Sequence, residues 1–173
     1  NNTLVSKYGG GGVVGINYGN GTIKDCTNSS NLYVENGLDD ETYEIFLGGI
    51  VAENEGEDIK NCVNYGIITA TANGSEYINV GGIIGGNNCE DAVEITNCHN
   101  QGNIIVQSIT PAVGGVVGLG ACNQISDCTN TGNITVDANY DEAVGGIVGV
   151  SRESTIERCY NAGDIEINAG SNG

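Results

Sequence analysis

Seven cysteines and a single histidine are the residues of this chain best suited to metal binding or redox chemistry. Five of the cysteines share one setting, Ile-x-x-Cys-x-Asn. These cysteines are Cys26, Cys62, Cys98, Cys128 and Cys159, and the asparagines that follow them are Asn28, Asn64, Asn100, Asn130 and Asn161. No Cys-x-x-Cys occurs, so the ligand spacing of a zinc site is absent. Because cysteine is a small and usually buried side chain, we predict that these five thiols pack in a core.

His99 and the carboxylates are the other candidates for chemistry. His99 lies between Cys98 and Asn100 at a predicted turn, without the motifs of a zinc peptidase or a serine hydrolase, and we predict no catalytic role for it. The carboxylates do not recur at one matched offset, so we predict a solvated acidic surface. A calcium site and a polysaccharide-cleaving acid pair are the alternatives. The clusters are Glu53/Glu55/Glu57/Asp58, Glu90/Asp91/Glu94 and Asp137/Asp141/Glu142.

The recurring spacing shows that the chain is built from repeats. Gly-Gly-apolar-apolar-Gly begins at Gly11, Gly81, Gly114 and Gly145, and a further copy at Gly48 ends in Ala52. The starts differ by 37, 33, 33 and 31 residues. We predict a single repeat domain over residues 1–173, a fragment of a larger protein. Its units are about 11–47, 48–80, 81–113, 114–144 and 145–169.

Each unit contains three strand-like segments: one around the double glycine, one ending at the cysteine, and one after Asn-x-Gly. A unit of about 33 residues cannot bury an apolar face alone, whereas stacked units can. A propeller would need four strands per unit and usually has aromatic blade motifs. We therefore predict an all-β fold, a right-handed parallel β-solenoid (β-helix) of about five three-strand rungs. Equivalent residues would stack into ladders with a spacing of about 4.8 Å.

Four local features of the repeat lead to further structural predictions. The Asn after each Cys suits a turn with left-handed backbone, and stacked copies can exchange amide hydrogen bonds. The Gly two residues later suits a positive φ. Adjacent apolar residues such as Ile83 and Ile84 should point to opposite faces of a strand, so we expect another element to cover the outer face. The long first unit, Thr27–Leu47, suggests a β-hairpin excursion or an end cap with an acidic patch.

Cys89 and Cys122 lie outside the Ile-x-x-Cys pattern. Each is eight residues after the first glycine of its unit, and the two units are adjacent. We expect these residues to face each other across neighbouring rungs. Two alternatives are open: a cross-rung disulfide if the protein is exported, or two unpaired thiols.

The charge balance excludes several classes of partner. Lys and Arg number 5 against 22 Asp and Glu, giving a net charge of −17. Such a chain has no surface that would neutralise phosphates, so nucleic acid and anionic membrane surfaces are not expected partners. No apolar run approaches the ~18 residues that span a bilayer, so we expect no membrane insertion.

Gly-Gly-Ile-Val-Gly followed by Ile-x-x-Cys-x-Asn-x-Gly-x-Ile resembles the GLUG-motif repeats of bacterial surface proteins. These proteins include large adhesins and the non-catalytic regions of immunoglobulin-A-cleaving metallopeptidases. The resemblance runs from Gly11 to about Asn168, with Ala52 and Ser30 as departures from the pattern. It implies a secreted or cell-surface location and a solenoid-like spacer. The peptidase motif is missing, so no catalytic residue carries over.

The sequence thus predicts a non-catalytic structural or adhesive repeat module of a large bacterial surface or secreted protein. No cofactor is expected, with calcium as the one alternative. Its expected partners are other domains of the same chain and a host glycan or protein. Two other functions stay open: an accessory or carbohydrate-active β-helix domain of a surface hydrolase, and a calcium-stabilised adhesin module.

Overall fold

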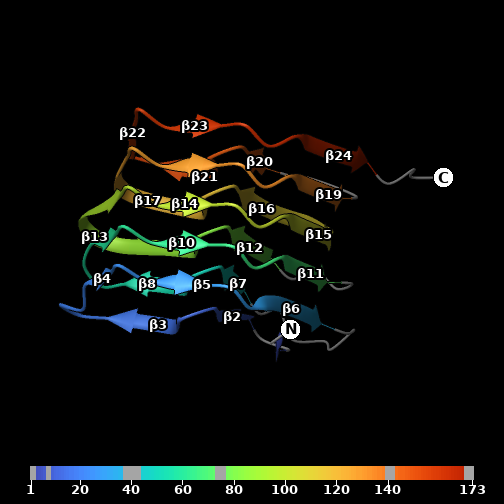
Figure 1. Cartoon of the computed structure of the whole chain (residues 1–173), viewed down its shortest axis with the longest axis horizontal. Helices are drawn as coiled ribbons and strands as arrows, with labels where there is room; N and C mark the ends of the chain where they lie inside the picture. The colour runs from blue at the N-terminus through green and yellow to red at the C-terminus, as the bar shows by residue number, and fades with distance from the viewer. Residues whose placement is uncertain (1–2, 7–8, 37–43, 73–76, 139–142, 170–173) are drawn as a thin grey trace.

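A computed structural model describes residues 3–6, 9–36, 44–72, 77–138 and 143–169. Within these ranges every regular element is a strand, and neighbouring strands pair in parallel. Equivalent strands of successive units stack into columns, so the chain climbs as a coil (Figure 1). The strands nearest the viewer in Figure 1 run from left to right as the chain rises, which makes the coil right-handed. The predicted parallel β-solenoid is confirmed.

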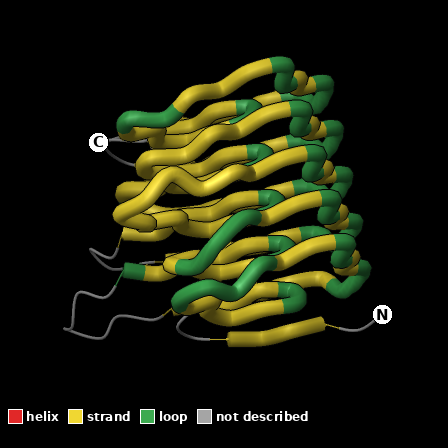
Figure 2. The backbone as a smooth tube through the Cα atoms, turned by 90° about the vertical axis from the view of Figure 1, so that its left-hand side faces the viewer, coloured by secondary structure: helices red, strands yellow, loops and turns green. Residues whose placement is uncertain are grey.

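The strands form four sheets, which each coil visits in the order II, III, IV, I. Sheet I contains β1 (Thr3–Ser6), β6 (Asn31–Asn36), β11 (Ile68–Ala72), β15 (Ile104–Ser108), β19 (Ile134–Ala138) and β24 (Ile165–Ala169). Sheet II contains β2 (Gly9–Gly11), β7 (Ile45–Gly48), β12 (Tyr77–Gly81), β16 (Thr110–Gly114) and β20 (Ala143–Gly145). Figure 2 shows the stacked coils from the side, with many of their turns aligned along one edge.

The other two sheets complete each rung. Sheet III contains β3 (Val14–Tyr18), β8 (Val51–Glu55), β13 (Ile84–Thr96), β17 (Val117–Ser126) and β21 (Val148–Arg152). Sheet III is continued by three short strands, β4 (Ile23–Lys24), β9 (Ile59–Lys60) and β22 (Thr155–Glu157). Sheet IV contains β5 (Thr27–Asn28), β10 (Val63–Asn64), β14 (His99–Asn100), β18 (Thr129–Asn130) and β23 (Tyr160–Asn161).

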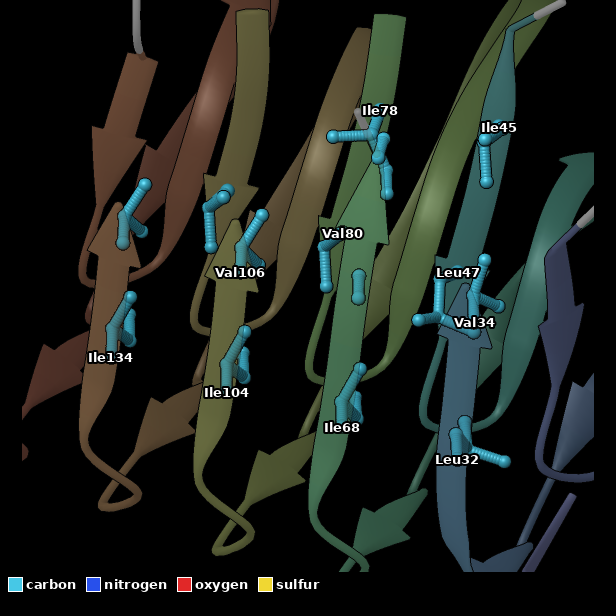
Figure 3. Close-up of a cluster of buried hydrophobic side chains, with 14 of the residues drawn as sticks. Leu32, Val34, Ile45, Leu47, Ile68, Ile78, Val80, Ile104, Val106 and Ile134 are labelled. Atoms are coloured by element: carbon cyan, nitrogen blue, oxygen red, sulfur yellow. The ribbon is translucent and has the colours of Figure 1, made fainter. Parts of the chain in front are cut away.

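Two hydrophobic cores run along the column. The first lies between sheets I and II, where Ile68, Ile104 and Ile134 occupy matching places on consecutive strands (Figure 3). The second joins the residues after each double glycine to the isoleucines and cysteines of Ile-x-x-Cys. Every rung therefore contributes the same few apolar positions, and in the middle rungs each position is covered by its equivalents above and below.

The double glycine marks a corner between sheets II and III, and this corrects one expectation. Ile83 and Ile84 are both fully buried in the second core. Their amide nitrogens both donate to the carbonyl oxygen of Val116 in the next rung, at 2.9 and 3.0 Å. Strict alternation holds only for a straight strand, and the bend turns both side chains inward. The expectation that another element covers an outward-facing apolar residue of each pair is therefore wrong.

The long first unit adds no hairpin or cap from its described residues. β5, β6 and β7 are ordinary rung strands that pair with β10, β11 and β12. The extra length falls between β6 and β7, where sheets I and II meet. The acidic patch at 39–41 lies outside the described residues.

Candidate functional site

The asparagine that follows each cysteine forms a continuous side-chain ladder. In the asparagine ladder (Asn28, Asn64, Asn100, Asn130 and Asn161), each Nδ2 donates to the Oδ1 of the next rung at 2.8 Å. The same Nδ2 donates to the carbonyl oxygen two residues later, for example from Asn100 to Gly102 at 2.8 Å. The three central members are fully buried. Because buried amides need partners, the ladder fixes the register of the rungs.

The backbone at these asparagines differs from the expectation. They lie in extended two-residue strands, so the left-handed turn predicted for them is wrong. The residue before each cysteine takes that conformation instead, with φ of 55°, 57°, 53°, 55° and 51° at Asp25, Asn61, Asn97, Asp127 and Arg158. Asn and Asp tolerate positive φ better than most residues, which accounts for four of the five.

The glycines of the motif are required by close packing against the ladder. A Cβ at Gly82 would lie 2.1 Å from the Gly115 oxygen and 2.3 Å from the Asn100 Cγ. The second glycine of every pair stands in the same relation to an asparagine of the ladder. The glycine after the asparagine, such as Gly102, has no positive φ, contrary to expectation. Its Cβ would lie 1.9 Å from the Gly66 oxygen of the rung below.

The five repeat cysteines form a second stack, the thiol ladder. Cys62, Cys98 and Cys128 are fully buried, Cys26 and Cys159 are half-buried, and all five are free thiols. Each Sγ donates to the carbonyl oxygen two residues earlier, at 3.2 to 3.4 Å. Burial raises the pKa of the Cys26 and Cys159 thiols. Hydrogen bonding to Cys128 and Cys62 raises the pKa of Cys98. Hydrogen bonding with Cys98 lowers the pKa of the Cys62 thiol to about 7, and the same interaction lowers the pKa of Cys128. A thiol with a raised pKa, such as Cys98, is a poor nucleophile and a poor metal ligand.

Cys89 and Cys122 lie in adjacent strands, directly after the paired residues Asn88 and Ala121. The register is interrupted at this point and resumes at Val93 and Asn123. The side chains of both cysteines lie outside the described part of the structure, so the disulfide and the two thiols remain alternatives.

A second amide ladder was not foreseen. In the short asparagine ladder, Asn17 donates to Asn54 at 2.8 Å, Asn54 donates to Asn87 at 2.6 Å, and Asn87 donates to Asn123. The signal in the sequence is an asparagine six residues after the first glycine in the first three units. The fourth unit has Gly120 at that register position, and its missing side chain leaves space for Asn123.

The remaining candidates are dispersed over the surface. His99 lies in β14, where Nδ1 is 2.8 Å from Thr129 Oγ1 and Nε2 is 3.0 Å from Asn97 Oδ1. Asp58 and Glu94 both pair with Lys60, at 2.8 and 2.7 Å. Side chains at positions 90, 91, 141 and 142 lie outside the described residues. Among the residues that are described, no three His, Cys, Asp or Glu side chains are placed to hold a metal ion.

One groove brings two carboxylates together, at the edge between sheets II and III in the first two rungs. Its volume is about 250 Å³. Glu44 accepts a hydrogen bond from Asn79 Nδ2 at 2.8 Å, which orients its carboxylate. Burial, together with the nearby carboxylates of Glu55 and Glu44, raises the pKa of Glu53. The groove is lined by Gly9, Gly10, Gly15, Ile16, Glu44, Phe46, Ala52 and Glu53.

The raised pKa of Glu53 predicts a pH-dependent effect of neutralising it. Because the pKa of Glu53 is raised above its ordinary value, the folded state binds the Glu53 proton more tightly than the unfolded state does. Ionisation of Glu53 at neutral pH therefore lowers the stability of the folded state. We expect Glu53→Gln to raise the melting temperature at pH 7 by about one or two degrees. The gain should shrink as pH falls through the carboxyl range, where Glu53 is itself protonated. Thermal melts of both proteins from pH 4 to pH 8 measure this, and an equal gain at every pH would contradict it.

No protein-family model, curated protein or solved structure matches this chain. The described residues contain no helix long and apolar enough to cross a membrane. The assignment of function therefore rests on the ladders, the groove and the charge distribution of the chain itself.

Proposed function

We propose that this chain is a rigid, non-catalytic structural module, a spacer within a larger bacterial surface or secreted protein. The asparagine ladder is the observation that carries the proposal, because it links all five rungs without interruption. The two hydrophobic cores and the thiol ladder likewise place the same residue types at matching positions of successive rungs. A column held at every level by buried amide hydrogen bonds and apolar side chains keeps a fixed length. The resemblance to GLUG-motif repeats supports the same role and location.

Mechanical stretching tests the spacer role directly. The chain would be placed between reference domains and pulled by its ends. Because each rung contacts only its neighbours, we expect rungs to peel off in discrete steps. One rung of about 33 residues should release about 110–120 Å of chain per step. Smooth extension at low force, without steps, would overturn the proposal.

An adhesive role is the other part of the predicted function. Binding of the chain to arrays of glycans, mucins and matrix proteins, with calcium and with a chelator, separates the two. Saturable binding would add an adhesive function, and its loss with chelator would indicate a calcium-dependent module.

The groove supports a second candidate, an accessory or carbohydrate-active domain. Paired carboxylates with one raised pKa are the arrangement that glycoside hydrolysis uses. Glu44 and Glu53 line one groove, and the pKa of Glu53 is raised. Incubation with a panel of polysaccharides, followed by analysis of released sugars, tests this. Release by the wild type and not by Glu53→Gln would establish it, and no release by either protein would dismiss it.

A further inference from the structure

The thiol ladder is a buried set of reactive side chains that the spacer role leaves unexplained. Its middle members, Cys62, Cys98 and Cys128, are fully buried in the second core. Each lies in a rung that is paired on both sides, so their setting does not depend on the first or the last rung. Alanine or valine would fill a core position without a reactive group. Packing alone therefore does not explain why the chain has cysteine at this position in every rung.

Successive sulfur atoms of the ladder lie about one rung apart. Each Sγ donates to the carbonyl oxygen two residues earlier, at 3.2 to 3.4 Å, so the five side chains share one orientation. Equivalent atoms of paired parallel strands are separated by about 4.8 Å. The sulfurs of Cys128 and Cys62 are close enough to Cys98 to influence the ionisation of its thiol. The ladder is thus a column of evenly spaced sulfur atoms.

This spacing is too wide for a disulfide and suits a bridging ion. A disulfide needs Cβ atoms about 3.8 Å apart, so joining two ladder cysteines would require their rungs to move together. A metal ion between two sulfurs, with metal–sulfur bonds of about 2.3 Å, needs the sulfurs about 4.6 Å apart. The column already provides that separation between neighbouring members.

The arrangement also selects the kind of ion. Two sulfurs, one above the other, provide a linear pair of ligands. Among the described residues no third His, Cys, Asp or Glu side chain is placed to complete a larger site. Zn(II) is almost always held by four ligands in structural sites, so a linear pair does not suit it. Sulfur ligands select soft ions such as Cu(I), which accepts two sulfurs in a line.

The surroundings of the middle thiols favour a positive ion. Cys98 Sγ lies 3.4 Å from the carbonyl oxygen of Thr96 and 3.6 Å from that of Ile59 in the rung below. Cys128 Sγ likewise lies 3.2 and 3.5 Å from two carbonyl oxygens. A thiol has one proton, so it donates to only one of the two oxygens at a time. The other oxygen directs the negative end of its dipole toward the sulfur, which stabilises a cation bound there.

We propose that the thiol ladder binds soft monovalent cations of the Cu(I) class, each held between the sulfurs of two successive rungs. In such a site one thiol releases its proton to solvent and binds as a thiolate, and its neighbour binds as a thiol. The charges of the thiolate and the ion cancel, so the bound unit is neutral, as an apolar core requires. This inference stands independently of the spacer proposal, because it concerns the chemistry of the ladder and not the mechanics of the column.

Neighbouring thiols differ in a way that fits this division of roles. Hydrogen bonding between neighbours lowers the pKa of Cys62 to about 7 and raises the pKa of Cys98. Cys128, on the other side of Cys98, again has a lowered pKa. In each pair, one sulfur releases its proton more readily than the other. Cys98 therefore only has to supply the second sulfur to an ion that Cys62 or Cys128 binds as a thiolate.

Silver(I) is the probe, because it shares the charge and the sulfur preference of Cu(I) and needs no reductant. Cys89 and Cys122 are first replaced with serine, so that the ladder supplies every thiol of this background protein. The ion is added in chloride-free buffer to the folded protein and, separately, before refolding from urea, because the middle thiols are buried. We expect X-ray absorption at the silver edge to show two sulfur neighbours per ion. One sulfur neighbour, or no bound silver after both treatments, would overturn the proposal.

Two variants of the background protein with equal numbers of thiols test whether neighbours are needed. Cys62→Ala/Cys128→Ala leaves three ladder cysteines, no two of them in adjacent rungs. Cys26→Ala/Cys159→Ala also leaves three, all in consecutive rungs. We expect the consecutive variant to retain silver binding and the alternating variant to bind roughly tenfold more weakly or worse, because its ions lose the second sulfur. Equal affinities would show that single thiols bind the ion, which refutes the bridged site.

Far-ultraviolet circular dichroism shows whether each variant is folded before the ion is added. Should the alternating variant not fold, Cys62→Ser/Cys128→Ser takes its place. A serine hydroxyl can still donate to the carbonyl oxygen, yet it is a poor ligand for a soft ion. The number of sulfur neighbours in the background protein decides the proposal in either case.

Discussion

Replacing Gly82 with alanine should lower the free energy of unfolding by more than about 3 kcal/mol, because the new methyl group has no space. Its Cβ would lie 2.1 Å from the Gly115 oxygen and 2.3 Å from the Asn100 Cγ. One contact belongs to the backbone of the next rung and the other to the buried asparagine ladder. Neither can move without breaking hydrogen bonds. Urea unfolding followed by far-ultraviolet circular dichroism measures the loss.

Gly15→Ala is the matched control. Gly15 belongs to the same kind of Gly-Gly-x-x-Gly motif, yet a Cβ there meets no atom within 4 Å. The second unit already carries Ala52 at this register position. We expect Gly15→Ala to change stability by less than about 0.5 kcal/mol. Similar losses in both variants would show that chain flexibility, and not the close packing, explains the glycine at position 82.

The repeat pattern was sufficient to predict the architecture. A period near 33 residues, with an apolar strand and a cysteine at fixed offsets, requires neighbours that cover the same positions. The stacked rows Ile68, Ile104 and Ile134 realise this directly. Fold class and register follow from the spacing, because each rung repeats one arrangement.

The corners were harder to predict, because residue type does not specify where the backbone bends. Adjacent apolar residues such as Ile83 and Ile84 suggested a strand covered on both faces. In the structure one carbonyl oxygen, that of Val116, accepts from both of their amides, and both side chains enter the core. The left-handed position was misplaced for a similar reason. Asn suits both a turn and a buried ladder, and only the stacking of rungs decides between them.

The groove could not be predicted from sequence spacing. Glu44 precedes the double glycine at Gly48–Gly49 and Glu53 follows it. They line the same groove because the corner folds sheet III back beside sheet II. The raised pKa of Glu53 then depends on burial and on neighbours that the fold brings close.

Asn100→Ala should destabilise the chain by about 4 kcal/mol, because it interrupts the asparagine ladder at its middle member, which is fully buried. Asn100 accepts from Asn64 Nδ2 and donates to Asn130 Oδ1, both at 2.8 Å. Its removal takes the acceptor from Asn64 Nδ2 in the rung below and the donor from Asn130 Oδ1 in the rung above, both in the buried interior. Each orphaned buried group costs about 1–3 kcal/mol. The melting temperature should fall by roughly 10 °C. Differential scanning calorimetry measures both quantities.

Asn161→Ala is the matched control, because it removes the same kind of side chain from the half-buried end of the asparagine ladder. Asn161 is half-buried in the last rung, and within the chain its Oδ1 serves Asn130 alone in the ladder. Water can replace that bond, so we expect a loss of about 1 kcal/mol. A loss equal to that of Asn100→Ala would contradict the role of burial. If both losses were small, the rungs would be held by their apolar rows and backbone pairing, and the ladder would serve to set their register.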